Sequence, residues 1–156
     1  MAFMDELDSA LIMALQADGR RTNRDLAGLL GVAPSTTLER TRSLRERGVI
    51  TGTHATIDLA ALGRPIRAMI TVRVRPQNRQ TIHGFRDYAA GLPETLDVFI
   101  TTGFEDVLLH VGLPSTAALQ DFVLDRLTTR KEVADIRTAV VFEHVRTHVV
   151  VPASQP

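Results

Sequence analysis

The sequence predicts an α+β protein in which a winged helix-turn-helix domain precedes a ferredoxin-like βαββαβ domain. Two observations lead to this fold class. In about the first 50 of the 156 residues, apolar side chains recur at the spacing of amphipathic helices. Later segments alternate with the period typical of strands, and two helical patterns interrupt them in the order β-α-β-β-α-β. We therefore expect a helix-turn-helix domain at residues 1–52, a linking strand and hinge at 53–64, a ferredoxin-like domain at 65–150 and a loose tail at 151–156.

Two short helices open the chain. The apolar stripe from Leu7 to Leu15 falls on one face of a first helix, which Asp18-Gly19 ends. Thr22 and Asp25 are spaced as a capping box, in which each side chain bonds to the other residue's backbone N–H, so a second helix begins there. Gly31 takes the position after its last turn.

A third helix runs from Pro34 to Arg47, because proline suits the first turn of a helix and Gly48 follows the last turn. We expect Leu38, Thr41 and Leu44 to face the interior. Three short helices joined by such tight connections form a helix-turn-helix unit.

The rest of the chain shows strand and helix patterns in turn. Residues 53–57 predict a β-wing or linking strand, and residues 59–63 a hinge. Ser115 is placed to cap the second helix of this half. The expected elements are a strand at 66–74, a helix with inward residues from Ile82 to Leu92, strands at 96–100 and 107–113 joined by a turn at 103–106, a helix with inward residues from Leu119 to Leu127, and a strand at 136–145.

One face of the predicted sheet is too apolar to face water. If Leu96, Val98 and Ile100 point toward the helices, their neighbours point the other way, because side chains alternate along a strand. The residues expected on this open face are Met69, Phe99, Thr101, Leu108, His110, Ala139, Val141 and Val145. Monomers rarely expose such a surface, so we expect it to pack against the same face of a second chain. The alternative is that the strand registers are shifted by one residue.

Positive charge is concentrated in the first domain. The chain has 18 basic and 18 acidic residues, yet seven arginines and three acids lie between Arg20 and His54, a local net charge of +4. With the third helix in the major groove of double-stranded DNA, Arg40 can donate two hydrogen bonds to guanine and Glu39 can accept one from cytosine. The alternative is an ordinary amphipathic helix with a solvated basic face. The expected DNA contacts are Arg20, Arg21, Asn23, Arg42 and Arg47 at phosphates, Thr36, Glu39, Arg40 and Ser43 toward the groove, and Ser35 and Thr37 as further contacts of the third helix.

Other kinds of site find little support. No cysteine is present, which excludes disulfides, thiolate zinc sites and cysteine nucleophiles. His144 and His148 lie four residues apart, but on a strand that spacing spans about 13 Å, too far for one metal ion. We expect no metal and no cofactor. An enzyme, or a metabolite-binding regulatory subunit of one, and a metal-sensing helix-turn-helix repressor are the competing interpretations, each with a poor set of candidate residues.

The N-terminus is acidic where a signal peptide would be basic, and no apolar run approaches the roughly 18 residues that a membrane span needs. We therefore expect a cytoplasmic protein without a membrane partner.

Several motifs agree in order and spacing with one known family. They are Leu15-Gln16-Ala17-Asp18-Gly19-Arg20, Asn23-Arg24-Asp25-Leu26-Ala27, Gly31-Val32-Ala33-Pro34-Ser35, Leu38 to Leu44, Gly48 to Gly52, Thr101 to Asp106 and Ile136 to Val141. Over nearly its whole length the chain resembles the Lrp/AsnC family of prokaryotic transcription regulators. The resemblance implies a homodimer formed through the sheet, assembly of dimers into tetramers or octamers, and an amino acid or related metabolite bound at the contact between dimers.

The resemblance also implies where that effector binds. Its candidate contacts are Thr101, Thr102, Gly103, Phe104 and Asp106, because Gly103-x-x-Asp106 matches the effector motif of the family, with Thr138 of a neighbouring subunit as an additional contact. A ligand ammonium would favour the carboxylates of Asp106 or Glu105, and a ligand carboxylate would favour backbone N–H groups near Gly103. Without the resemblance, these residues form only a hairpin turn in which Gly103 permits a positive φ.

Three departures from the family pattern affect these expectations. Ala33 stands where the family often has a capping serine, so the third helix either lacks a cap or is capped by Ser35 in the next register, with its DNA-reading positions shifted. His54 replaces an aromatic residue of the wing, and Phe104-Glu105 replaces the usual tyrosine motif, so the effector need not be leucine or asparagine.

The expected function is that of a sequence-specific DNA-binding transcriptional regulator, not an enzyme, controlled by an amino-acid effector through changes in oligomer assembly.

Overall fold

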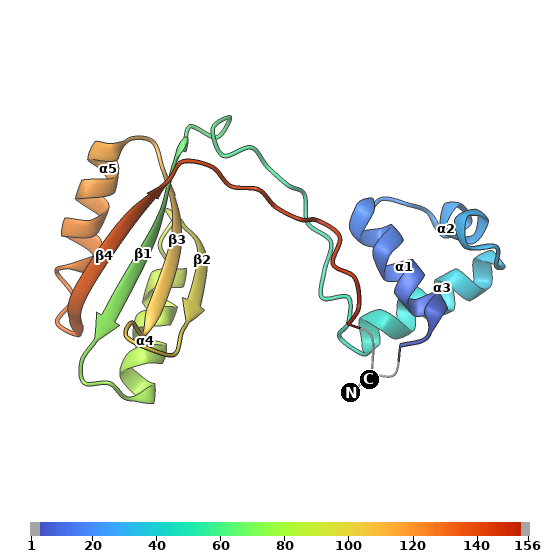
Figure 1. Ribbon diagram of the computed structural model, residues 1–156, viewed down its shortest axis with the longest axis horizontal. Helices are drawn as coiled ribbons and strands as arrows, with labels where there is room; N and C mark the ends of the chain where they lie inside the picture. The colour runs from blue at the N-terminus through green and yellow to red at the C-terminus, as the bar shows by residue number, and fades with distance from the viewer. Residues whose placement is uncertain (1–3, 154–156) are drawn as a thin grey trace. The chain divides into compact units, whose positions relative to one another are not determined.

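The computed structural model describes residues 4–153, and the chain divides into two compact units. The first comprises the residues up to Ala55 together with those from Val145 onward, and the second comprises Thr56–His144 (Figure 1). The second unit was expected to extend to residue 150. It ends earlier because the segment from Val145 joins the first unit, where the side-chain amide of Gln16 exchanges two hydrogen bonds of 2.9 Å with the backbone of Val150. The expected loose tail lies mostly outside the described residues, which end at position 153.

The first unit contains the three predicted helices: α1 (Glu6–Ala17), α2 (Asn23–Leu30) and α3 (Pro34–Glu46). The capping box of Thr22 and Asp25 is confirmed, and Gly31 ends α2 in the left-handed conformation with φ 67°. The Asp5 side chain caps α1 by accepting from the backbone N–H of Asp8. The buried core of this unit consists of Leu11, Ala14, Leu26 and Leu44.

The orientation of α3 differs from the sequence prediction. Leu38 was expected inside but is 56% exposed, whereas Thr37 is fully buried. The Thr37 hydroxyl lies 2.9 Å from the backbone carbonyl oxygens of Asn23 and Pro34, so its polar group is satisfied in the interior. Thr37, Thr41 and Leu44 therefore face inward, and the side chain of Thr37, an expected DNA contact, is buried between α2 and α3.

The predicted β-wing does not form as a strand. Within residues 4–153, no strand is assigned between α3 and the first strand of the second unit. A strand needs a hydrogen-bonding partner, and residues 53–57 pair with no other strand in the part of the chain that the structure describes. The hinge at 59–63 folds as a tight turn, closed by a hydrogen bond of 2.8 Å from the Arg64 N–H to the Leu59 carbonyl, with Gly63 at φ 73°.

The second unit has the predicted ferredoxin-like order of elements. It consists of β1 (Ile66–Val74), α4 (Arg79–Ala90), β2 (Thr95–Ile100), β3 (Val107–Leu113), α5 (Thr116–Asp121) continued by the π-helical turn η1 (Phe122–Leu127), and β4 (Val133–Val141). The strands form one antiparallel sheet in the order β2-β3-β1-β4. The last strand begins and ends earlier than the expected 136–145.

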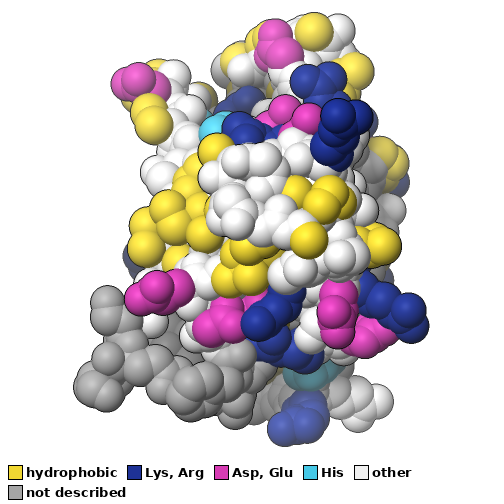
Figure 2. Space-filling model, turned by 90° about the vertical axis from the view of Figure 1, so that its right-hand side faces the viewer, with side chains coloured by type: hydrophobic (Ala, Val, Ile, Leu, Met, Phe, Trp, Pro, Cys, Tyr) yellow, Lys and Arg dark blue, Asp and Glu magenta, His cyan; other side chains and the backbone are white. Residues whose placement is uncertain are grey.

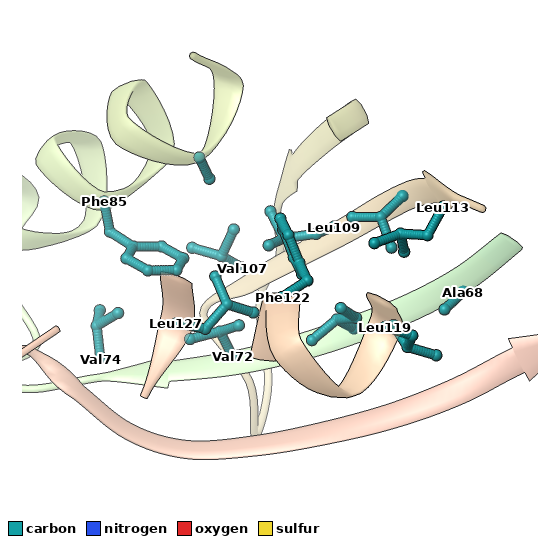
Figure 3. Close-up of a cluster of buried hydrophobic side chains, with 13 residues drawn as sticks. Ala68, Val72, Val74, Phe85, Val107, Leu109, Leu113, Leu119, Phe122 and Leu127 are labelled. Carbon is teal, nitrogen blue, oxygen red and sulfur yellow. The ribbon is translucent and has the colours of Figure 1, made fainter. Parts of the chain in front are cut away.

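The core of this unit lies between the sheet and its helices. Phe85 of α4 and Leu119, Phe122 and Leu127 of α5 and η1 pack over the buried side chains of β1 and β3 (Figure 3). Ala68, Ile70, Val72 and Val74 alternate inward along β1, as their spacing predicts. Among the described residues of this unit, no helix covers the opposite face of the sheet (Figure 1).

The composition of the open face is partly as predicted. A register irregularity between Thr95 and Asp97 breaks the alternation of β2. Leu96, expected on the helix side, consequently lies beside Gly112 and Leu59 on the open side. Two residues expected on this face are absent from it: Thr101 follows the end of β2, and Val145 belongs to the first unit. The strands retain Met69, Phe99, Leu108, His110, Ala139 and Val141, and we refer to these six residues as the open face.

Candidate functional site

A buried carboxylate joins α3 to the start of α1. The side chain of Asp8 is only 2% exposed, and its two oxygens lie 3.2 Å from the Arg40 guanidinium and 3.0 Å from the Arg47 guanidinium. Arg40 also contacts Asp5 at 2.6 Å. We call Asp5, Asp8, Arg40 and Arg47 the Asp8 cluster. A buried charge is tolerated only when it is paired, so this cluster holds α3 in one position against α1.

The charges of this cluster reinforce one another. The backbone N–H of Asp8 and the guanidinium of Arg40 lower the pKa of the Asp5 carboxyl from its ordinary value. In turn, the hydrogen bond and negative charge of Asp5 raise the pKa of Arg40. Both groups are therefore charged at neutral pH and remain paired.

Arg40 and Arg47 form ion pairs within the first unit. Arg40 was expected to extend from the outward face toward guanine, and Arg47 toward phosphate. In the structure both guanidinium groups bond to carboxylates of the α1 region. Arg40 is drawn sideways on α3 by Asp5 and Asp8, two partners that are distant in sequence. Thr36 and Ser43 lie half-buried on the same flank of α3.

A different set of side chains faces solvent along α3. Ser35, Leu38, Glu39 and Arg42 are exposed, and we call these four residues the outer face of α3. Arg42 is bonded one turn onward to Glu46 at 2.7 Å. Ala33 provides no side-chain cap, yet the helix begins at Pro34, so the structure shows no shift of the helix start. Acidic and basic side chains lie next to each other on the visible surface, rather than forming one positive patch (Figure 2).

The start of α2 holds the remaining candidate DNA contacts. Arg20 is strongly exposed and forms a loose pair with Asp18 at 3.6 Å. Arg21 and Asn23 are half-buried beside it. The carbonyl of Asn23 accepts the Thr37 hydroxyl, so the beginning of α2 is tied to the first turn of α3. The structure thus brings these residues close to α3 within one unit.

A second buried aspartate fixes the turn between β2 and β3. Asp106 is 2% exposed, and its Oδ2 accepts from the Val74 N–H at 2.9 Å and lies 3.6 Å from the Arg75 guanidinium. Its Oδ1 accepts from the side-chain amide of Gln77. Asp106 was expected to offer its carboxylate to a ligand ammonium, and here both of its oxygens are bonded to the chain's own donors in a buried position. Asp106 instead attaches the turn to the end of β1.

The tip of this turn is exposed. Thr101 closes it, with its N–H donating to the Asp106 carbonyl and its hydroxyl to the Glu105 carbonyl, both at 3.0 Å. Gly103 has φ 115°, a conformation that glycine adopts without strain. Thr102, Gly103 and Phe104 are exposed at the tip. The turn is therefore rigid at its base and accessible at its tip.

Two arginines that the sequence reasoning missed accompany the tip. The Arg73 guanidinium lies 3.5 Å from the centroid of the Phe104 ring, and its Nε donates to the Phe104 carbonyl at 3.0 Å. Arg137 lies 5.1 Å from the same ring and 3.6 Å from Glu105. The signal was present in the sequence, because alternation along β1 and β4 places both arginines on the side of the sheet away from the helices.

Thr138 does not join these residues within one chain. It pairs with Ile70, whose side chain points into the helix-covered core, so Thr138 faces the opposite side of the sheet from Arg137. Of the six expected effector contacts, the structure brings together the five residues of the turn.

The sequence matches two domain descriptions of one family. Residues 4–45 match the AsnC-type helix-turn-helix domain, and residues 67–151 match the Lrp/AsnC ligand binding domain. The chain belongs to the Lrp/AsnC family.

Individual relatives support the same assignment. This Lrp/AsnC chain is 38% identical over 143 residues to the HTH-type transcriptional regulator AldR of Mycolicibacterium smegmatis, across 92% of this chain and 84% of that protein. It is 32% identical over 143 residues to the leucine-responsive regulatory protein of Rhizobium meliloti, across 92% of each. The crystal structure of a transcriptional regulator of Neisseria meningitidis in complex with L-Met matches with a TM-score of 0.88 at 27% identity, covering 96% of this chain and 97% of that chain.

These findings confirm the predicted fold class and the prediction of a regulator rather than an enzyme. The Lrp/AsnC chain is a DNA-binding transcriptional regulator with a helix-turn-helix domain and a ligand-binding domain. In the part of the chain that the structure describes, no helix is both long enough and apolar enough to cross a membrane.

We predict that Asp8→Asn lowers the free energy of unfolding by about 1–3 kcal/mol, because Arg40 and Arg47 lose their shared counter-charge while remaining able to reach water. Asp18→Asn, which alters an exposed pair in the same unit, is the matched control and should change it by less than about 0.5 kcal/mol. Urea unfolding followed by helical circular dichroism measures both. Equal stability of the two variants would contradict the positioning role of Asp8.

We predict that Asp106→Ala lowers the free energy of unfolding by about 1–3 kcal/mol, because the buried N–H of Val74 loses its acceptor. Amide hydrogen exchange should show faster exchange at Val74 in this variant. Asp135→Ala, which removes an exposed carboxylate 3.7 Å from Arg137, should leave both stability and exchange unchanged. A stable Asp106→Ala variant with a protected Val74 amide would show that Asp106 does not hold the turn.

Proposed function

We propose that this Lrp/AsnC regulator recognises specific DNA sequences with the outer face of α3, and that an amino acid bound at the β2–β3 turn controls recognition by changing oligomer assembly. The observation that carries the proposal is the orientation of α3. Its inner residues and the Asp8 cluster are committed to packing, while Ser35, Glu39 and Arg42 are left exposed on one side. In a helix-turn-helix motif, formed here by α2 and α3, the exposed side of the second of the two helices contacts base edges in the major groove. That helix is α3.

The exposed groups suit distinct parts of a DNA duplex. Glu39 can accept a hydrogen bond from the amino group of cytosine, and the hydroxyl of Ser35 suits either a base or a phosphate. Arg42, together with Arg20 and Arg21 before α2, would contact phosphates, which positions the protein without reading sequence. Arg40 and Arg47 contribute indirectly, because they hold the helix that carries these groups.

The effector proposal concerns the exposed tip of the β2–β3 turn. Backbone N–H groups near Gly103 are suited to a ligand carboxylate. Because Asp106 is 2% exposed and the Glu105 side chain is 26% exposed, Glu105 is the neighbouring carboxylate that can approach a ligand ammonium. The Neisseria meningitidis regulator, crystallised with L-Met, supports an amino acid as the class of ligand.

We also propose that the open face packs against the same face of a second copy. Phe99 is 47% exposed there, and Met69, Leu108 and Val141 lie on the same side without a covering helix. Burying a contiguous apolar surface of this kind is favourable. An effector that binds one assembly of such dimers better than another shifts the population, and DNA affinity follows the favoured assembly.

The DNA-reading proposal is tested with duplexes that the wild-type chain selects from a random pool. Glu39→Ala should weaken binding to the selected sequence by about 1–3 kcal/mol, because it removes a base contact. It should not weaken binding to random duplex, because it also removes a negative charge. Arg20→Ala should weaken both alike and reduce the salt dependence. Arg79→Ala on α4, an exposed arginine of the other unit, is the control. Equal losses on selected and random DNA for Glu39→Ala would remove Glu39 from base reading.

The effector proposal is tested by thermal shift with the twenty amino acids, with light scattering on each stabilising compound. At least one amino acid should raise the melting temperature by mass action and alter the particle size. Glu105→Gln should reduce the thermal shift while leaving the ligand-free melting temperature unchanged. The control Asp121→Asn should change neither the shift nor the ligand-free melting temperature. If none of the twenty stabilises the wild-type chain, the ligand is not an amino acid.

A further inference from the structure

Leu38 is an apolar side chain on the outer face of α3. It is 56% exposed and belongs to neither buried cluster of the protein. Ser35 precedes it by three residues and Arg42 follows it by four, so the three side chains form a row along the helix. A leucine here contributes little to folding, because more than half of its surface stays in water.

The neighbouring side chains limit what this row can recognise. Arg40, the side chain best suited to guanine, is drawn sideways by Asp5 and Asp8. Arg42 is anchored through its Nε to Glu46 at 2.7 Å. The centre of the row therefore presents an apolar group with polar groups one turn before and one turn after it.

We propose that Leu38 recognises the C5-methyl group of a thymine in the major groove. The inference rests on the proposed contact between the outer face of α3 and DNA. The methyl group of thymine is the apolar feature that the four base pairs present in that groove, and an apolar side chain distinguishes it by contact. Excluding water between the two hydrocarbon surfaces provides the discrimination. Leu38 thus specifies thymine, while Ser35 and Arg42 fix the register of the helix.

The experiment replaces thymines of the selected duplex one at a time with deoxyuracil, which lacks only the methyl group. At one thymine in each half-site, the wild-type chain should lose about fourfold in affinity, the effect of removing one buried methyl-sized group. Leu38→Ala should bind the thymine and deoxyuracil duplexes equally. Leu29→Ala is the matched control, because Leu29 is an exposed leucine of α2 in the same unit, and it should retain the fourfold difference.

A second substitution separates the methyl group from the rest of the base. Replacing the sensitive thymine with cytosine should weaken wild-type binding, and replacing it with 5-methylcytosine should recover about fourfold. Leu38→Ala should show no recovery. Its melting temperature should match that of the wild type, because the side chain is exposed.

The outcomes distinguish this inference from the function on which it rests. If the wild-type chain enriches no sequence from the random pool, both the proposed DNA reading and the role of Leu38 fail. If a sequence is enriched but deoxyuracil makes no difference at any position, or if Leu38→Ala keeps the discrimination, only the role of Leu38 is overturned.

Discussion

The burial of the Asp8 carboxylate is the constraint on which the DNA-binding unit depends. A carboxylate that is 2% exposed must be paired, and both Arg40 and Arg47 of the α3 region provide its partners. This pairing, together with the hydrogen bond from Thr37 to the Asn23 carbonyl, sets the rotation of α3 about its own axis as well as its position. That rotation decides which side chains face a DNA duplex and which face the protein.

The ligand-binding unit uses the same device at its own exposed element. Asp106 is also 2% exposed, and its bonds to the Val74 backbone and to Gln77 attach the β2–β3 turn to the sheet. In both units a buried aspartate positions an exposed element, α3 in one and the turn tip in the other. Neighbours such as Glu39 and Phe104 keep their side chains in solvent, and the proposed function assigns contact with DNA and effector to these exposed elements.

Features set by local interactions could be predicted from the sequence. The capping box at Thr22, the glycine end of α2 and the bounds of β1 depend on residues close in the chain, and all three were correct. Leu38 was predicted to be buried because it is hydrophobic. Thr37 takes the buried position instead, because its hydroxyl donates to the Asn23 carbonyl of α2, which contributes to the rotation of α3.

Features that depend on distant residues could not be predicted in this way. Arg40 was assigned to DNA because its acidic partners lie more than thirty residues away. The displacement of Leu96 follows from an irregular pairing of β2 with β3, which cannot be recognised in the amino-acid sequence of β2. Asp106 was identified as important by its motif, but its role depends on the end of β1. In each case the residue was noticed and its partner was missed.

The orientation of α3 is tested most directly by disulfide trapping on DNA, since the chain contains no native cysteine. Single cysteines are introduced at Glu39, on the outer face, and at Ser43, on the flank that faces the Asp8 cluster. Each variant is mixed with selected duplexes carrying a thiol on a base in the major groove. The orientation described above predicts rapid disulfide formation at position 39 and little at position 43. Efficient trapping at position 43 with none at position 39 would contradict it.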